Sequence, residues 1–282
     1  MDTVQQFLVQ QRQKARYGDI YIDSLCINQQ DLEERISQVQ SMGEIYSNAA
    51  TVYVWLGESV CCTDYSLGYA QELRTQGSGL GPWIQNTMNH IFSLDYWTQT
   101  WIVQEFLLAK HVEILCGSEA LDLKLLNEFF ADLFEGTIED MQKKNTAEFI
   151  DTHAHRLLRQ KENRRLRPLA KVLIDNNRTA YTDIRDKVYG FLGLCGDVTV
   201  DYSFPVDYSP QKTTETLFFD VVAFCDVHAD SVVAFCHYLR DSLRLTVCPI
   251  ASDAAEASSA TISKIFPRLN TQHLVNPNPA PT

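Results

Sequence analysis

The chain has 282 residues, enough for one large domain or two small ones. Hydrophobic residues make up 45% of it and charged residues 21%, which is ordinary for a globular protein with a sizeable core. The formal net charge of -12 repels phosphate backbones, so the composition speaks against nucleic-acid binding.

The sequence also speaks against membrane insertion and metal binding. It has no run of about 18 apolar residues, and its N-terminal segment has no apolar core of the signal-peptide type, so we expect a cytoplasmic protein without a membrane span. In that compartment the 8 cysteines should be reduced. No C-x-x-C pair occurs, so we expect no metal site and cysteines that are mostly small buried side chains.

The N-terminal part predicts a helix and then a strand–helix–strand unit. The helix is expected over 3–16, and the two strands over 20–27 (IYIDSLCI) and 51–56 (TVYVWL). Between the strands, Asp31 followed by Glu34 is a capping-box pattern that begins an amphipathic helix. This order is typical of a parallel sheet with helices on its faces.

Farther along, the apolar patterns predict mostly helices. A strand is expected over 111–116, an exposed mixture of helix and loop over 136–168, and helices over 82–94, 100–110, 121–135, 169–176, 186–195, 213–226 and 229–240. The Ala-, Ser-, Asn- and Pro-rich C-terminus predicts disorder. We therefore divide the chain into an α/β core over 1–120, a mainly helical part over 121–245 and a disordered tail over 246–282.

Polar residues gather near the end of the first predicted strand. Asp23 lies within it, and Asn28 and Gln29 follow it, ahead of Asp31. Ligands of open parallel sheets bind beyond the carboxyl ends of the strands, so this edge predicts a binding site. The structural alternative is local turn and cap chemistry, which we favour for Asp31. For Asp23 we favour a functional role, because a buried carboxylate must find partners.

The segment TWIVQEFLLAK places a carboxylate among apolar residues. Trp101 and Glu105 are four residues apart and share one helical face. A carboxyl group in such surroundings often has a raised pKa, as catalytic acids and bases do, so Glu105 is a candidate catalytic residue. The alternatives are a structural ion pair between Glu105 and Arg185, and a Trp101 that simply belongs to the core.

Arg185 begins the third informative segment, YTDIRDKVYGFLGL. Its guanidinium is suited to clamping a carboxylate or phosphate group of a ligand. The alternative is a structural network at the start of a helix, with Asp183 or Asp186 near the positive helix end. For Asp186 and Lys187 we favour the structural alternative, and for Arg185 both remain open.

Three stretches together resemble the fungal heterokaryon incompatibility (HET) domain. Residues 21–57 follow the family's patterns W-I-D-A-x-C-I-N-Q-x-D, E-R-x-x-Q-V, M-x-x-I-Y and A-x-x-V-x-V-W-L-G. Residues 96–117 follow W-x-R-x-W-x-x-Q-E, and residues 181–194 follow T-D-P-R-D-K-V-Y-x-L-L-G-L. The resemblance implies a role in fungal non-self recognition and programmed cell death, a form of innate immunity, with protein partners or self-association.

The chain departs from the family pattern in three places. The family opens with a strand of the type L-S-Y-x-W-G, which precedes the part that matches here, so the resemblance implies an N-terminally truncated core. Gln99 stands where the family usually has Arg, and Ile184 where it has Pro. These departures make an inactive truncated paralogue one of the alternatives.

HET domains are in turn distantly similar to Toll/interleukin-receptor (TIR) domains, several of which cleave NAD with the glutamate of a W-C-x-x-E pattern. Trp101 and Glu105 have the same spacing. The resemblance implies an α/β fold with a mostly parallel sheet in a TIR- or flavodoxin-like three-layer arrangement. It implies NAD as a substrate rather than a cofactor, a catalytic Glu105, and a nucleotide pocket lined by Asp23, Asn28 and Trp101. With Gln29 and Arg185, which the residue patterns suggest, these are the expected ligand-binding residues. A non-enzymatic death module that oligomerises or recruits a partner is the alternative.

Overall fold

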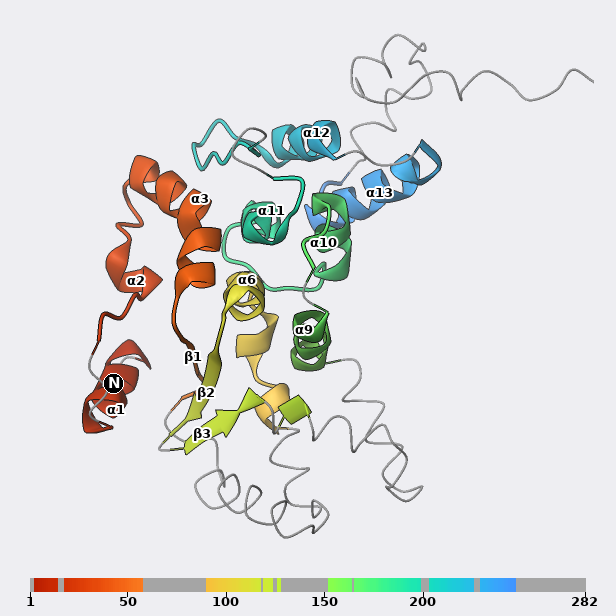
Figure 1. Cartoon of the computed structure of the whole chain (residues 1–282). Coiled ribbons are helices and arrows are strands. Elements are labelled where there is room, and N and C mark those ends of the chain that lie inside the picture. The colour runs from red at the N-terminus through yellow and green to blue at the C-terminus, as the bar shows by residue number, and fades with distance from the viewer. Residues whose placement is uncertain are drawn as a thin grey trace, which may run out of the picture. The chain divides into compact units, whose positions relative to one another are not determined.

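The protein is described from a computed structural model, shown in Figure 1. The residues that it describes are 3–14, 18–57, 90–117, 119–123, 126–127, 152–163, 165–198, 203–225 and 229–246. The chain forms two compact units, Met1–Arg165 and Leu166–Thr282, and the boundary predicted at residue 120 falls inside the first of them. The expected C-terminal tail beyond 246, and most of the helices expected over 82–94 and 121–135, lie outside the described residues.

The first unit contains a three-stranded sheet in the order β1 (Val52–Trp55), β2 (Val112–Cys116), β3 (Glu119–Asp122). β1 and β2 are parallel and β2 and β3 are antiparallel, so the strands predicted over 51–56 and 111–116 are confirmed. β3 takes the first residues of the segment predicted as a helix over 121–135. The reason is Gly117, whose φ of 54° turns the chain back along β2, a conformation that favours glycine.

The strand predicted over 20–27 is wrong. Residues 19–22 are extended but belong to no strand of the described sheet, and Asp23–Cys26 form the short helix α2. Asp23 accepts a hydrogen bond from the Ser24 N–H at 2.6 Å, a local bond of the kind that competes with strand pairing. The predicted strand–helix–strand unit is therefore wrong too. Asp23 is a half-buried residue at the start of a helix, not a carboxylate inside a buried strand.

The helix after this segment begins as predicted. α3 (Leu32–Asn48) is capped by Asp31, whose Oδ1 accepts hydrogen bonds from the backbone N–H groups of Glu33 at 3.0 Å and Glu34 at 3.1 Å. The Glu34 carboxylate accepts from the Asn28 N–H at 3.1 Å, so the cap also fixes the preceding turn. This local network sets the point at which the chain enters α3.

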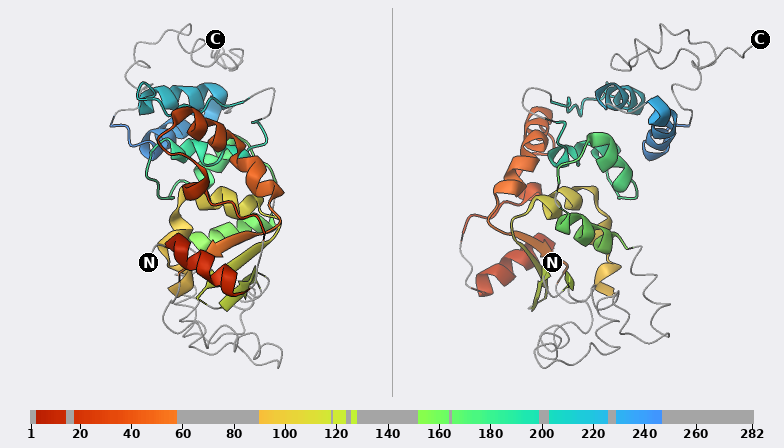
Figure 2. Two further views of the ribbon diagram at one scale, coloured as in Figure 1. Left: turned by 90° about the vertical axis from the view of Figure 1, so that its left-hand side faces the viewer. Right: turned by 45° about the vertical axis from the view of Figure 1, so that its right-hand side comes forward.

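Helices lie on both sides of the sheet in the views of Figures 1 and 2. α1 (Thr3–Gln13) packs Phe7 against the outward rings of β1, with centroids 5.9 Å from Tyr53 and 6.0 Å from Trp55. The other side holds α6 (Thr100–Leu108), predicted over 100–110, and α9 (His153–Glu162). The α/β class is supported, while the TIR- or flavodoxin-like layering stays a prediction.

The second unit is mainly helical, as expected. Its elements are α10 (Leu169–Asp175), α11 (Asp186–Tyr189), the 3-10 helix η2 (Leu192–Leu194), α12 (Thr214–Phe224) and α13 (Ala229–Ser242). Its core includes fully buried aromatic rings, among them Tyr189, Phe204 and Phe218. None of the described helices in either unit is long and apolar enough to cross a membrane.

The end of α6 depends on a lysine from another helix. The Lys161 ammonium, on α9, donates to the carbonyls of Phe106 at 2.7 Å and Ala109 at 2.9 Å, and it lies 5.3 Å from the centroid of the Phe106 ring. Carbonyls at a helix C-terminus have no partner within the helix, and a cation there is favourable. Lys161 therefore ties α9 to the helix that carries Glu105.

Replacing this lysine by a side chain of similar length without charge tests the contact. We expect Lys161→Met to lower the free energy of unfolding of the full chain by about 1–2 kcal/mol, because the two carbonyls lose a charged donor. Denaturant titration followed by circular dichroism measures the change. Arg159→Met on the same helix is the control, because that side chain is 66% exposed and should contribute less than about 0.5 kcal/mol. Equal changes in the free energy of unfolding for the two substitutions would show that the contacts of Lys161 with α6 do not stabilise the fold.

Candidate functional site

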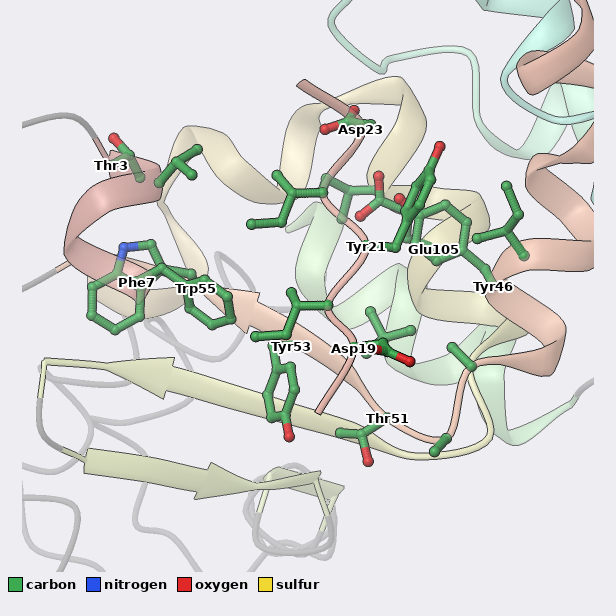
Figure 3. A pocket seen from close by; sticks show the side chains of 18 of the residues that line it. Thr3, Phe7, Asp19, Tyr21, Asp23, Tyr46, Thr51, Tyr53, Trp55 and Glu105 are labelled. Atoms are coloured by element: carbon green, nitrogen blue, oxygen red, sulfur yellow. The ribbon is translucent and has the colours of Figure 1, made fainter. Parts of the chain in front are cut away.

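The first unit contains a cavity of about 600 Å³ (Figure 3). Its walls come from α1, the extended segment 19–23, the C-terminal end of α3, β1 with the residues just before it, and α6. Cavities of this size are typical of sites for small molecules. The cavity thus brings together elements that lie far apart in the sequence.

Three carboxylates line the cavity. Asp19 and Asp23 come from the extended segment and the start of α2, and Glu105 comes from α6, where Ile102, one turn earlier, faces the same space. No basic side chain is found among the described residues that line it. The cavity is therefore acidic, and its charge favours cations over anions.

Glu105 has the most perturbed carboxyl group of the site. Its pKa is raised from 4.5 to about 7, mainly by burial and also by the negative charge of Asp23, against a smaller lowering by a hydrogen bond with Tyr46. Burial, together with the charges of Glu105 and Asp23, also raises the pKa of Tyr46, so the phenol stays protonated and donates to Glu105. The Glu105 carboxyl group is thus able to exchange a proton near neutral pH, as general acids and bases do.

Aromatic side chains form much of the remaining wall: Phe7, Tyr21, Tyr46, Tyr53, Trp55 and Tyr96. In Figure 3, Tyr21 and Tyr46 lie beside Glu105, while Phe7 and Trp55 lie on the opposite side of the pocket. The indole Nε1 of Trp55 is buried and has no hydrogen-bond partner among the residues that the structure describes. The walls therefore combine ring faces with a small number of polar atoms, the usual composition of a ligand pocket.

The structure brings together two of the predicted site residues, Asp23 and Glu105. Asn28 and Gln29 are exposed and do not line the cavity. Asn28 instead accepts a hydrogen bond from the Gln30 N–H at 3.1 Å, which matches the turn chemistry that was the alternative. Trp101 is half-buried on α6 and also lies outside the lining, so its role in binding stays a prediction.

Arg185 belongs to the second unit, where its guanidinium is already engaged. Nε and Nη2 donate to the two carboxylate oxygens of Asp183 at 2.9 and 2.8 Å, and Nη1 donates to the Ser209 carbonyl at 2.9 Å. The guanidinium also lies 5.2 Å from the centroid of the Tyr208 ring. These contacts support the structural alternative, because Asp183 rather than Glu105 is the ion-pair partner. The ligand clamp stays a prediction.

Sequence reasoning missed most of the aromatic wall and one carboxylate. Tyr46 was assigned only to the apolar face of the amphipathic helix that became α3. Tyr21 was assigned to the strand over 20–27, which does not form. Asp19 lies between the helix predicted over 3–16 and the strand predicted over 20–27, and it was not a candidate site residue. The matched family pattern around Tyr21 and Tyr46 was the one signal that could have pointed to them, whereas Asp19 and Tyr96 carried none.

The described cysteines are all free thiols. Cys116, Cys195, Cys225 and Cys236 are buried, as expected of small apolar side chains, and Cys26 is exposed. The described part of the chain also contains no group of three or more His, Cys, Asp or Glu side chains placed to hold a metal ion.

Comparison with known proteins finds a similarity to one family in the N-terminal part. Residues 1–105 match the family model described as heterokaryon incompatibility protein (HET). The chain is also 24% identical, over 258 residues, to a Neurospora crassa protein named heterokaryon incompatibility protein 6, OR allele. That match covers 71% of this chain and 37% of the relative, so the chain spans little more than a third of the relative's length. No solved structure matches the chain. Asp23 and Glu105 lie inside the residues matched by the family, and Arg185 lies beyond them.

The raised pKa of Glu105 predicts a pH-dependent stability. Because the folded chain holds this proton up to about pH 7 and the unfolded chain loses it near 4.5, stability should fall as pH rises between these values. We expect Glu105→Gln, which keeps a hydrogen-bond acceptor for Tyr46, to be roughly 1–3 kcal/mol more stable than the wild type at pH 8 and similar to it at pH 4.5. Thermal unfolding across this pH range measures the difference. The control is Glu44→Gln, an exposed position on α3, and wild-type and Glu105→Gln curves that stay parallel would contradict the assignment.

The contacts of Arg185 predict a structural role that needs no ligand. Arg185→Met should lower the free energy of unfolding by about 2 kcal/mol, because the half-buried Asp183 carboxylate and the Ser209 carbonyl lose charged donors. Denaturant unfolding of the ligand-free chain measures it. In the matched control, Arg240→Met, the lost partner is the neighbouring Asp241, which is 67% exposed, and little change is expected. Unaltered stability in Arg185→Met would favour the ligand clamp instead.

Proposed function

We propose that this chain, whose residues 1–105 match the heterokaryon incompatibility family, is an effector of fungal non-self recognition and that the cavity around Glu105 is its functional site. The observation that carries the second part is the Glu105 carboxyl group itself. It lies in an aromatic cavity, it shares that cavity with Asp23, and its pKa is raised toward neutrality. Perturbed carboxyl groups in cavities are typical of catalytic sites.

The activity that we propose for this site is cleavage of NAD. The N-glycosidic bond between nicotinamide and ribose breaks, and the bond electrons leave with nicotinamide, which becomes neutral. Water adds to the ribose C1′ and releases one proton, so the products are ADP-ribose, nicotinamide and a proton. The transition state resembles an oxocarbenium ion, which a nearby carboxylate stabilises.

The residues of the cavity have distinct roles in this scheme. Glu105, once ionised, stabilises the positive charge that develops on the ribose or orients the ribose hydroxyls. The Tyr46 hydroxyl holds the Glu105 carboxylate in place, and Asp23 keeps a second negative charge in the same cavity. Since Glu105 ionises only near pH 7, the reaction should be slow below that pH and faster above it.

A non-enzymatic module that kills by self-association or partner recruitment is the second candidate, and a feature of α2 favours it. This helix buries none of its side chains, and Leu25 is 64% exposed. Leu32, at the start of α3, is 40% exposed. Exposed apolar side chains that gather on one surface are typical of protein contact sites. In this alternative the Glu105 cavity is not needed for cell death.

The enzymatic proposal is tested by incubating the purified full chain with NAD and measuring nicotinamide release. We expect release that increases with pH through about 7 and falls at least 100-fold in Glu105→Gln, because the amide cannot carry the stabilising charge. Glu44→Gln should retain full activity. A folded protein that releases no nicotinamide at high concentration, where self-association is favoured, would refute NAD cleavage.

Expression of the same variants in a fungal host separates the two candidates. NAD cleavage predicts that Glu105→Gln abolishes cell death and that Leu25→Ser has a weaker effect. Self-association or partner recruitment predicts the reverse order. Cell death that survives Glu105→Gln but not Leu25→Ser would replace the first proposal with the second.

A further inference from the structure

We infer that the cavity selects a flat organic cation, namely a pyridinium ring such as the oxidised nicotinamide ring, and keeps phosphate groups outside. The selection for positive charge follows from the cavity alone. The identification of the cation with nicotinamide rests on the proposed function. If NAD is the substrate, its nicotinamide end enters the cavity, and the cavity accepts the oxidised rather than the reduced form.

The charge argument comes from the lining. Asp19, Asp23 and Glu105 contribute carboxylates from three separate positions in the chain, and the described lining residues include no lysine, arginine or histidine. Burial is the main cause of the raised pKa of Glu105, and the negative charge of Asp23 in the same cavity raises it as well. A cation placed between the two carboxylates relieves their repulsion, whereas a phosphate adds to it.

The aromatic walls make the cavity suitable for a flat ring. Phe7 and Trp55 are 6.0 Å apart between ring centroids and tilted by 59°, and they lie across the pocket from Tyr21, Tyr46 and Glu105 (Figure 3). A cationic ring between these two sides has aromatic faces on one side and carboxylate oxygens on the other. Aromatic faces attract cations through their quadrupole, and indole does so most strongly. The phenol groups of Tyr21 and Tyr46 stay neutral because burial raises their pKa, that of Tyr21 to about 12.

These two properties together determine how a dinucleotide can bind. The nicotinamide ring and its ribose enter the cavity, and the pyrophosphate stays outside, because the three carboxylates of the lining repel it. The reduced nicotinamide ring has no positive charge, so it gains nothing from the acidic wall. The cavity should therefore reject the reduced cofactor even though its shape is almost the same.

The inference is tested with two small probes that contain no phosphate and no cleavable bond. One is 1-methylnicotinamide, a pyridinium cation, and the other is nicotinamide, its neutral counterpart. Binding to the full chain is measured by calorimetry and by quenching of tryptophan fluorescence, to which Trp55 in the cavity wall contributes. We expect the cation to bind at least tenfold more tightly, and its affinity to fall at high salt. Equal affinities, or tighter binding of the neutral ring, would overturn the inference.

Three variants assign the effect to the cavity. Asp23→Asn and Glu105→Gln should each weaken binding of the cation by roughly tenfold and leave the neutral probe unaffected, because each removes one attracting charge. Glu44→Gln, which removes an exposed carboxylate from α3, should bind within twofold of the wild type. Because Asp23 is only half-buried, Asp23→Asn provides a second test that does not change the buried carboxyl group. Wild-type affinity in Asp23→Asn would overturn the assignment.

The binding of the two probes and the release of nicotinamide from NAD test different claims. Selective binding of 1-methylnicotinamide by a protein that releases no nicotinamide from NAD would support the inference and refute cleavage. Nicotinamide release together with equal binding of both probes would support cleavage and refute the inference.

Discussion

The site depends on one hydrogen bond between two helices. The Tyr46 hydroxyl on α3 donates to the Glu105 carboxylate on α6, in a cavity where burial and the charge of Asp23 both oppose ionisation of Glu105. Because α3 packs on α6, this bond lies where the two helices meet. Among the described residues, this hydrogen bond is the contact that lowers the pKa of Glu105 and so favours its charged form.

Contacts outside the cavity hold α6 in place. Lys161 from α9 donates to the carbonyls at the end of α6, and most apolar residues of α6 are buried. Glu105 is therefore carried on a helix that is fixed at its C-terminus. A carboxyl group with a raised pKa destabilises the fold at neutral pH, and such a cost is usual where a side chain is kept for function rather than for stability.

The second unit uses its polar residues differently. Arg185 and Asp183 form a two-point ion pair, and the buried Asp186 accepts a hydrogen bond from the Tyr208 hydroxyl at 2.6 Å. These contacts join α11 to the segment that precedes α12. The charged groups around Arg185, which the sequence suggested for ligand binding, thus form contacts within the second unit. The described lining of the acidic cavity, in contrast, contains no basic side chain to pair with its carboxylates.

Several elements of the fold could be predicted from the sequence because they follow from patterns of nearby residues. The capping residue Asp31, the helices α3, α6, α12 and α13, and the strands β1 and β2 follow from periodicity and caps. The apolar neighbours of Glu105 were also enough to predict a perturbed carboxyl group. For the cap and the helices, the deciding interactions lie within a few residues along the chain.

Only the tertiary structure decided the rest, because it depends on contacts between distant segments. A strand requires a partner to pair with, so the β-branched composition of residues 20–27 could not by itself place them in the sheet. Whether Trp101 or Ile102 faces the cavity depends on how α6 is rotated against α3, which no pattern within α6 specifies. The meeting of Asp19, Tyr46 and Glu105 in one acidic cavity likewise follows from packing alone, because these residues come from three elements that are separate in the sequence.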